Sequence, residues 1–501
     1  MSSQELRPTY TLGSPAERTG LGGLSMKTTL TLLAGMVTFV LFSLVGATKA
    51  AFLVVLPATG IIAAITYIKI GGRNLAEIAQ MVVQDMLRNN RQEQYYVSGG
   101  FSDVPNGAYQ LPGMLAATRL AVGKDHRGEE FAVIVDDNFA EATVVLDVQL
   151  SGQSAVTQDE RNVMTASWGA WLASLSLSGD IRSASVTVAT FPSSGELVRQ
   201  EVNRIVVDDA PAIAKQILAE AADELSAGLP EISAHVAVTF KISREQLQDD
   251  AFLDVLATRL PALIDPLVWA GMLAEPMNQD KLCARVHTAF NPASEVDFEQ
   301  LGVQGVSHGM GWNDIGPSMA VAERSLLRHE SVISRTWEMT QAPRANFEDR
   351  VLTRLLAPHP RLLRKRVTLV YRPFEAGAGA RRVEAEHQDA LVAANAGRGA
   401  VSARAEVRLE QTQASRRAQA RGAQLGRYSL FVTTTVDDEA KLRAVNEDVS
   451  QLAATSGIRL KVAARQQDTA FAACLGVGSA PWVRSSLVQA PALIQKGFGD
   501  D

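Results

Sequence analysis

Two long uncharged runs near the N-terminus set the strongest limit on how this chain folds. Residues 28–48 carry no charged side chain over 21 positions, residues 50–67 carry none over 18, and only Lys49 separates them. A bilayer core of about 30 Å takes roughly 20 apolar residues in a helix. A helix is also the form in which so short a segment satisfies its own backbone polar groups without water. We therefore predict a transmembrane helical hairpin over residues 27–72.

The charges that flank these runs predict an orientation. The turn between them offers Lys49 alone, whereas basic residues stand outside the pair, namely Arg7, Arg18, Lys27, Lys69, Arg73 and Arg88. Positive charge is retained on the cytoplasmic side of a membrane. We expect a multi-pass protein of the inner (cytoplasmic) membrane with both termini in the cytoplasm. A cleaved signal peptide is the alternative, but its apolar region is typically about 7–15 residues, which is shorter than the first run.

Composition narrows the functions open to the rest of the chain. The net charge of -6 argues against bulk nucleic-acid binding, so we expect no direct contact with nucleic acid. The two cysteines, Cys283 and Cys474, lie far apart and form no metal-binding spacing. We interpret them as buried thiols in a reducing compartment. No pattern predicts a metal site or a bound cofactor.

Alternating and amphipathic patterns after the hairpin predict an α+β fold of mostly antiparallel strands with packed helices. We expect a flexible arm over 1–26, a first α+β cytoplasmic domain over 73–274, a second over 275–478 and a C-terminal tail over 479–501. In the first domain, helices are expected at 74–89, 159–175, 209–225 and 243–260, and strands at 131–137, 142–150, 183–191 and 234–242. In the second, strands are expected at 335–340, 366–374, 428–436 and 458–464, and helices at 346–356 and 437–455.

Two further stretches of the second domain have distinctive compositions. Residues 291–317 are rich in Gly, Asn and Asp and predict a loop. Residues 377–426 are rich in Ala and Arg with a helical period, interrupted by Gly397 and Gly399, and predict a long helix or a helical hairpin. Because acidic residues offset its arginines, we interpret this segment as an exposed interaction arm.

The catalytic motifs that the chain could carry are absent or poorly placed. A P-loop requires GxxxxGK[ST], and Gly123-Lys124 is followed by Asp125. Residues 305–309 match GxSxG, but that elbow needs a buried strand before it and a helix after it. The flanks here are acidic or glycine-rich. We interpret the motif as a flexible glycine loop, with a serine hydrolase that uses Ser307 as the alternative.

Charged clusters carry weaker hypotheses. Asp136-Asp137 and Asp208-Asp209 could serve as metal carboxylates, but acidic residues at strand ends are ordinary turn formers and helix starters. A basic cluster, made up of Arg361, Arg364, Lys365 and Arg366, precedes the strand at 366–374. We interpret it as a solvated charge run, with contact to lipid headgroups, a partner or nucleic acid as the alternative. We expect no catalytic residue.

Several segments resemble known families. The hairpin over 27–72 resembles the PrgI family, the small membrane subunit of type IV secretion and conjugation machines. The rest resembles the N-terminal, non-ATPase domain of the VirB-type traffic ATPases. The residues that carry this second likeness are Ser334-Arg335-Thr336-Trp337-Glu338-Met339-Thr340-Gln341-Ala342-Pro343-Arg344, Gly426-Arg427-Tyr428-Ser429-Leu430-Phe431-Val432, Gly457-Ile458-Arg459-Leu460, Gln467, Ala470-Phe471 and Leu475-Gly476. The resemblance implies the actinobacterial arrangement, in which the hairpin is fused to this domain and the motor is a separate polypeptide.

The resemblance implies a membrane-anchored structural component that docks a separate P-loop ATPase. The implied partners are that ATPase, other secretion-channel membrane subunits and the lipid bilayer, within an oligomer. A type VII secretion component similar to EccE is a second hypothesis, since that family also joins two membrane helices to a cytoplasmic α+β region. A membrane serine hydrolase is a third hypothesis, and a nucleic-acid-binding coupling factor is a fourth.

Overall fold

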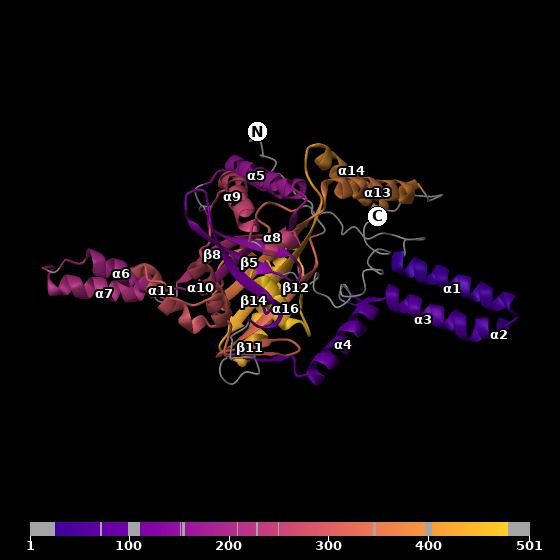
Figure 1. Ribbon diagram of the computed structural model, residues 1–501, viewed down its shortest axis with the longest axis horizontal. Helices are drawn as coiled ribbons and strands as arrows, with labels where there is room; N and C mark the ends of the chain where they lie inside the picture. The colour runs from indigo at the N-terminus through magenta and orange to yellow at the C-terminus, as the bar shows by residue number, and fades with distance from the viewer. Residues whose placement is uncertain are drawn as a thin grey trace.

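The structure is a computed structural model with an extended N-terminal part and a central sheet (Figure 1). It describes residues 26–70, 73–98, 111–150, 152, 156–207, 209–226, 229–248, 250–343, 347–395 and 403–478. Most of the expected arm over 1–26 and the expected tail over 479–501 lie outside these residues, as do Asp208 and Arg344.

The apolar runs form helices that lie side by side (Figure 1). The first is α1 (Met26–Leu44), and the second begins with α2 (Thr48–Ala50) and continues through the π-helical turn η2 (Ala51–Val55) into α3 (Leu56–Tyr67). The Phe39 and Phe52 rings meet edge to face at 5.1 Å. A Cβ atom at Gly35 would lie 2.1 Å from Thr59 Cγ2, so glycine is what permits this close approach.

Helix α4 (Leu75–Asn90) connects these helices to the sheet, after a two-stranded ribbon of β1 (Lys69–Ile70) and β2 (Arg73–Asn74). Two ion pairs fasten α4 to the C-terminal part of the chain. Arg88 meets Asp468 at 3.0 Å, and Arg465 meets Asp85 at 3.6 Å, with all four side chains largely buried. The amphipathic helix predicted at 74–89 is confirmed.

Within the described residues, thirteen strands form one antiparallel sheet. Eleven of them follow the order β3-β10-β11-β12-β14-β13-β7-β8-β6-β5-β4, while β9 pairs with β6 and β15 pairs with β12. The strands are β3 (Tyr95–Val97), β4 (Thr118–Lys124), β5 (Glu130–Asp136), β6 (Glu141–Leu150), β7 (Ile181–Pro192), β8 (Pro230–Lys241), β9 (Met272–Pro276), β10 (Met319–Ala322), β11 (Leu327–His329), β12 (Val332–Gln341), β13 (Arg364–Pro373), β14 (Gly426–Val436) and β15 (Arg459–Val462). The predicted α+β class with mostly antiparallel strands is confirmed.

Eight of the thirteen strands form two half-sheets with the same topology. One has the order β9-β6-β8-β7 and the other β15-β12-β14-β13. Each is a ferredoxin-like βαββαβ unit with a helical hairpin inserted between its second and third strands. The equivalent strands β7 and β13 pair antiparallel with each other and join the halves. This is the self-complementary pairing that relates two copies by an approximate two-fold axis.

The helices follow the same repeat. In the first half they are α5 (Gln158–Leu177), the hairpin of α6 (Glu196–Ile205) and α7 (Ala212–Ser226), α8 (Arg244–Gln248), α9 (Phe252–Trp269), α10 (Gln279–Phe290) and α11 (Glu295–Gln304). In the second they are α12 (Thr353–Leu356), the hairpin of α13 (Ala376–Asn395) and α14 (Ala403–Ala420), α15 (Leu442–Thr455) and α16 (Gln467–Cys474). The two hairpins project in different directions from the sheet (Figure 1).

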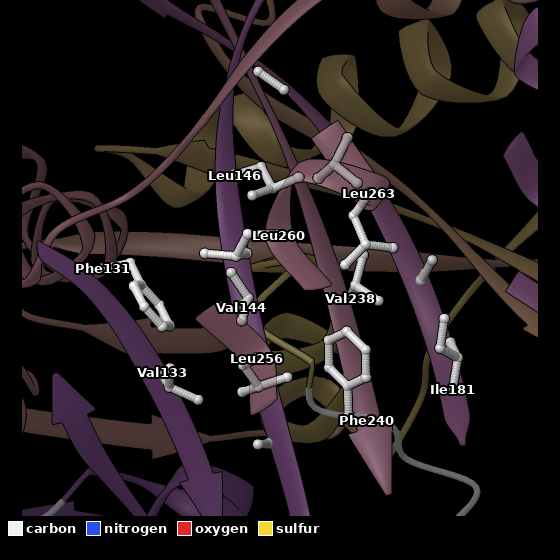
Figure 2. Close-up of a cluster of buried hydrophobic side chains, with 14 of the residues drawn as sticks. Phe131, Val133, Val144, Leu146, Ile181, Val238, Phe240, Leu256, Leu260 and Leu263 are labelled. Carbon is white, nitrogen blue, oxygen red and sulfur yellow. The ribbon is translucent and has the colours of Figure 1, made fainter. Parts of the chain in front are cut away.

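Helices cover both faces of the sheet. Helices α5 and α9 pack on one face of the first half, where Val144, Val238 and Phe240 meet Leu256 and Leu260 (Figure 2). Helices α12 and α15 cover the same face of the second half. Helices α10 and α16 lie on the opposite face. The strands are rich in Val because residues buried on both faces favour β-branched side chains.

Three differences from the predicted elements have local causes. The helix predicted at 243–260 is split into α8 and α9, because Asp250 has a positive φ of 50°. The loop predicted at 291–317 contains α11, which begins with Glu295 and Asp297 in its first turn and ends at Gly305 with a φ of 65°. In the region predicted as a helix over 346–356, the described residues form a helix only in α12.

The packing of Trp171 predicts a large loss of stability when its ring is removed. Trp171 is 1% exposed, and its indole N–H donates to the Leu263 carbonyl at 2.9 Å. Replacing a buried Trp by Ala removes packing and leaves a cavity, so Trp171→Ala is expected to lower the free energy of unfolding by about 3–5 kcal/mol in urea denaturation. Trp269→Ala is the control, because Trp269 is 73% exposed. Equal losses in the two variants would contradict this packing.

Candidate functional site

A cavity of about 660 Å³ lies over the joint between the two half-sheets. Strands β7, β8, β13 and β14 form its floor, and α10, α11 and residues 305–308 form its roof. Helix α10 packs over β5, β6 and β8, whereas α16 packs against β12, β13 and β14. The space above the joint is therefore left between two helices that each cover their own half.

Polar side chains line the floor because of the period of the strands. Arg364 and Arg366 stand two residues apart on β13, so both face the same side of the sheet. On β8, Ser233 and His235 have the same relation and also line the cavity. Strand β7 lies between β13 and β8 and pairs antiparallel with β13, with Arg366 opposite Ala189. A small residue beside the arginine leaves room above it.

Two cations of α10 share one carboxylate at the cavity. Lys281 and Arg285 are one helical turn apart and contact Asp147 at 2.6 and 2.9 Å. Arg285 also donates to the Ser233 hydroxyl at 3.1 Å, while its Nε is buried without a hydrogen-bond partner. Across the cavity, Arg364 pairs with Glu295 of α11. Each of these three cations therefore has a carboxylate partner, but Lys281 and Arg285 have the same one, Asp147.

Arg366 differs from these cations because it has no carboxylate partner among the described residues. Its guanidinium lies over the Phe471 ring at 4.9 Å from the centroid. Burial lowers the pKa of Arg366 to about 10, which is still high enough to keep the side chain charged at neutral pH. A half-buried guanidinium with free donors beside a cavity favours an anion as its missing partner.

His235 is a neutral hydrogen-bonding group in the cavity floor. Its Nε2 lies 2.9 Å from the Leu475 carbonyl, and because a carbonyl only accepts, Nε2 carries the proton. Burial lowers the pKa of His235 to about 3, and Nδ1 is buried without a partner. Gly476 follows with a φ of 69°, and a Cβ atom there would lie 2.0 Å from Thr187 Oγ1. Glycine at this position lets the chain pass close over the sheet.

The GxSxG stretch lines the cavity but lacks the geometry of a nucleophile elbow. It follows helix α11 rather than a strand, and Gly305 is the C-cap of that helix. The Ser307 hydroxyl accepts a hydrogen bond from Gly309 N at 3.2 Å. Both ring nitrogens of His308 bond to the backbone, at Asp280 O and Met310 N. In the described part of the chain, no histidine is positioned to activate Ser307.

The basic cluster before β13 is not one solvated charge run: that interpretation is wrong for Lys365, although the side chain of Arg361 is 63% exposed. Lys365 is 2% exposed, its ammonium donates to the Ala357 carbonyl at 2.6 Å, and burial lowers its pKa to about 8. Arg361 pairs with Asp448 on the opposite side of the sheet. With Arg364 and Arg366 facing the cavity, the cluster is divided between the two faces of β13.

The other residues singled out in the sequence have structural roles. Asp136 is buried at the end of β5 and accepts from the Asn138 backbone N–H at 3.1 Å, as a turn former does. Among the described residues, no group of three or more His, Cys, Asp or Glu side chains is placed to hold a metal ion. Cys283 and Cys474 are buried free thiols, as predicted, and burial raises the pKa of Cys283 to about 12.

Sequence reasoning missed the cavity because its parts come from distant segments. The floor and the roof join residues from 189 to 475. One signal was present: arginines at alternate positions of an otherwise Val-rich strand predict a charged stripe on one of its faces.

Comparison with known proteins bears on the N-terminal region. Residues 17–77 match a family model described as a domain of unknown function (DUF8461). This match covers both apolar helices and the start of α4 and leaves the sheet outside it. No curated protein matches the chain.

Buried neutral histidines predict that acid destabilises the protein. Burial lowers the pKa of His235 to about 3 and that of His329 to about 4, below the usual 6.5. As the pH falls below 6.5, the unfolded chain takes up protons first, so stability falls by up to about 1.4 kcal/mol per pH unit for each group. Urea midpoints measured from pH 7 to pH 5 check this. The loss should be smaller in His235→Gln and unchanged in His126→Gln, because His126 is exposed; a pH-independent midpoint would contradict it.

Proposed function

We propose that this protein is a membrane-anchored structural component of a type IV secretion or conjugation-like machine, in which it docks a separate P-loop ATPase at the cytoplasmic membrane. One observation carries the anchoring: two adjacent apolar helices, exposed along most of their length, are joined through α4 to a folded sheet. The docking of a motor rests on the sequence resemblance.

The exposure of the apolar helices distinguishes them from core helices. The window Thr48–Ile65 has a mean hydropathy of 1.9, and 6% of it is buried. Among the described residues it is the one helix long and apolar enough to cross a membrane, and at about 1.5 Å per residue it measures roughly 27 Å. The neighbouring apolar helix, Thr28–Leu44, is shorter. An apolar surface of this extent exposed to water would be very costly, which favours a bilayer around it.

Polar groups on these helices are compatible with an apolar environment. The hydroxyls of Thr38, Ser43 and Thr59 donate to backbone carbonyls one turn earlier, at 2.8–2.9 Å. Such bonds leave no free donor toward lipid. Lys49 is the middle residue of α2, at the end of the pair that is remote from the sheet (Figure 1). A hairpin that enters and leaves the bilayer on the side of the sheet fits this arrangement.

Charges placed in the middle of both helices should abolish membrane association. Met36 and Leu56 are 70% and 55% exposed, so Met36→Arg with Leu56→Arg removes no buried contact. Each arginine near the bilayer centre costs about 2.5–3.5 kcal/mol, and we expect the variant to leave the membrane fraction in a flotation assay. The control is Val163→Arg with Val255→Arg, two exposed sites on α5 and α9. Wild-type protein that stays wholly soluble would contradict the anchoring.

The α6–α7 arm offers the partner an apolar surface. Ile213 and Ile217 stand one turn apart on α7 and are 70% and 58% exposed. Ile213→Asp with Ile217→Asp should reduce copurification of a P-loop ATPase from native membranes, because a charge in an apolar interface is desolvated without a partner. Val163→Asp with Val255→Asp, at exposed sites on α5 and α9, is the matched control.

Mass spectrometry of the copurified material identifies the partner. A motor with three ATPase domains in tandem would favour the type VII hypothesis, and recovery of no ATPase with the wild-type protein would contradict docking.

A further inference from the structure

We propose that the cavity between the half-sheets is a binding site for a nucleoside phosphate, with the phosphoryl group on Arg366 and Arg285. The site is independent of the proposed membrane role, since it is built from residues of the sheet, of α10 and α11 and of the segments next to them, with Leu475 after α16.

The anionic end of the ligand is assigned by the unmatched donors. Arg366 has no ion-pair or hydrogen-bond partner for its guanidinium among the described residues and is in contact with the Phe471 ring instead. Arg285 also lines the cavity. Its Nε is buried without a hydrogen-bond partner, and it shares the Asp147 carboxylate with Lys281. Guanidinium groups bind phosphate through paired, charge-assisted hydrogen bonds. Arg366 makes no such contact among the described residues, and Arg285 shares its carboxylate with Lys281.

The remaining groups select an organic molecule rather than a bare anion. A volume of about 660 Å³ is within the range of small-molecule sites and far exceeds that of an inorganic anion. Apolar side chains occupy part of the lining, among them Phe191, Val286 and Leu301. These surfaces suit a flat, weakly polar group such as a base, and they would leave a purely ionic ligand poorly accommodated.

Hydrogen-bond acceptors line other parts of the cavity and call for donors on the ligand. His235 Nδ1 is an acceptor without a partner. The carboxylates of Asp280 and Glu299 also line the cavity; Ser194 bonds to Glu299, and burial raises the pKa of Glu299. Carboxylates would repel a ligand that is anionic throughout, whereas ribose hydroxyls and base amino groups can donate to them. A nucleoside phosphate combines one anionic end with several donors.

Calorimetric titration of the full chain, in detergent or lipid nanodiscs, tests the assignment with ATP, AMP, pyrophosphate and adenosine. We expect ATP or AMP to bind, and both pyrophosphate and adenosine to bind at least tenfold more weakly. Pyrophosphate that binds as tightly as the nucleotides would overturn the organic part of the proposal, and adenosine that does so would overturn the phosphate part. Absence of nucleotide binding at millimolar concentration would overturn the whole.

Variants locate the binding. Arg366→Gln should weaken nucleotide affinity by about 10- to 100-fold, the value of one charged hydrogen-bonded contact. It should change the melting temperature little, because the arginine loses no ion pair or hydrogen bond, and its contact with the Phe471 ring is the one it gives up. Arg361→Gln is the control from the same basic cluster, on the far side of the sheet. Equal affinity in Arg366→Gln and wild-type protein would overturn the site.

A second variant tests the cavity without a change of charge. A Cβ atom at Gly302 meets no atom within 4 Å, and Gly302 lines the cavity on α11. Gly302→Leu is expected to fill space at the cavity and to weaken nucleotide binding at least tenfold. This variant keeps the proposal testable if Arg366→Gln does not fold. Unaltered binding in a folded Gly302→Leu protein would overturn the assignment to this cavity.

Discussion

The pairing of β7 with β13 is the contact on which the rest of the architecture depends. Seven residue pairs, from Lys365 opposite Thr190 to Tyr371 opposite Ala184, join the two half-sheets. Without this contact, each half would expose a long, Val-rich edge strand with unpaired backbone groups, which is a site for aggregation. At its centre, the buried hydroxyls of Thr187 and Thr368 bond at 2.8 Å. Polar atoms inside a sheet are tolerated because they satisfy each other.

The joint also accounts for the cavity. Since α10 and α16 are equivalent helices in the repeat, each is placed over the strands of its own half. The two helices meet where the rings of Phe290 and Phe471 lie 5.2 Å apart. Polar side chains, among them Arg366 and His235, line the cavity at this position. Arg366 stands on β13 directly beside the joint, opposite a small residue of β7, and the Gly476 turn passes close to Thr187 and His235. When two copies of one fold pair through their equivalent edge strands, a cavity with a polar lining is thus left where the copies meet.

How much of this could be read from the sequence depended on the range of the interactions involved. Strands such as β8 and β14 were predicted within a few residues, because alternation and Val content are local properties. The pairing order was not predictable, since β7 and β13 are separated by most of the first half and by the start of the second. Helix α11 was missed because its glycine- and asparagine-rich surroundings outweighed an acidic first turn and a C-terminal glycine. Lys365 was predicted to be exposed because it is charged, but the charge of a residue does not show whether the fold buries its side chain.

Helix α16 connects the two features of greatest functional interest. At its N-terminal end, Asp468 receives Arg88 of α4, the helix that leads to the apolar pair. One turn further, Phe471 lies against the Arg366 guanidinium, and Leu475, just after the helix, accepts from His235. The buried Gln467 ties α16 to the Thr336 backbone through two hydrogen bonds. One short helix therefore holds both the ion pair with α4 and the contact with Arg366.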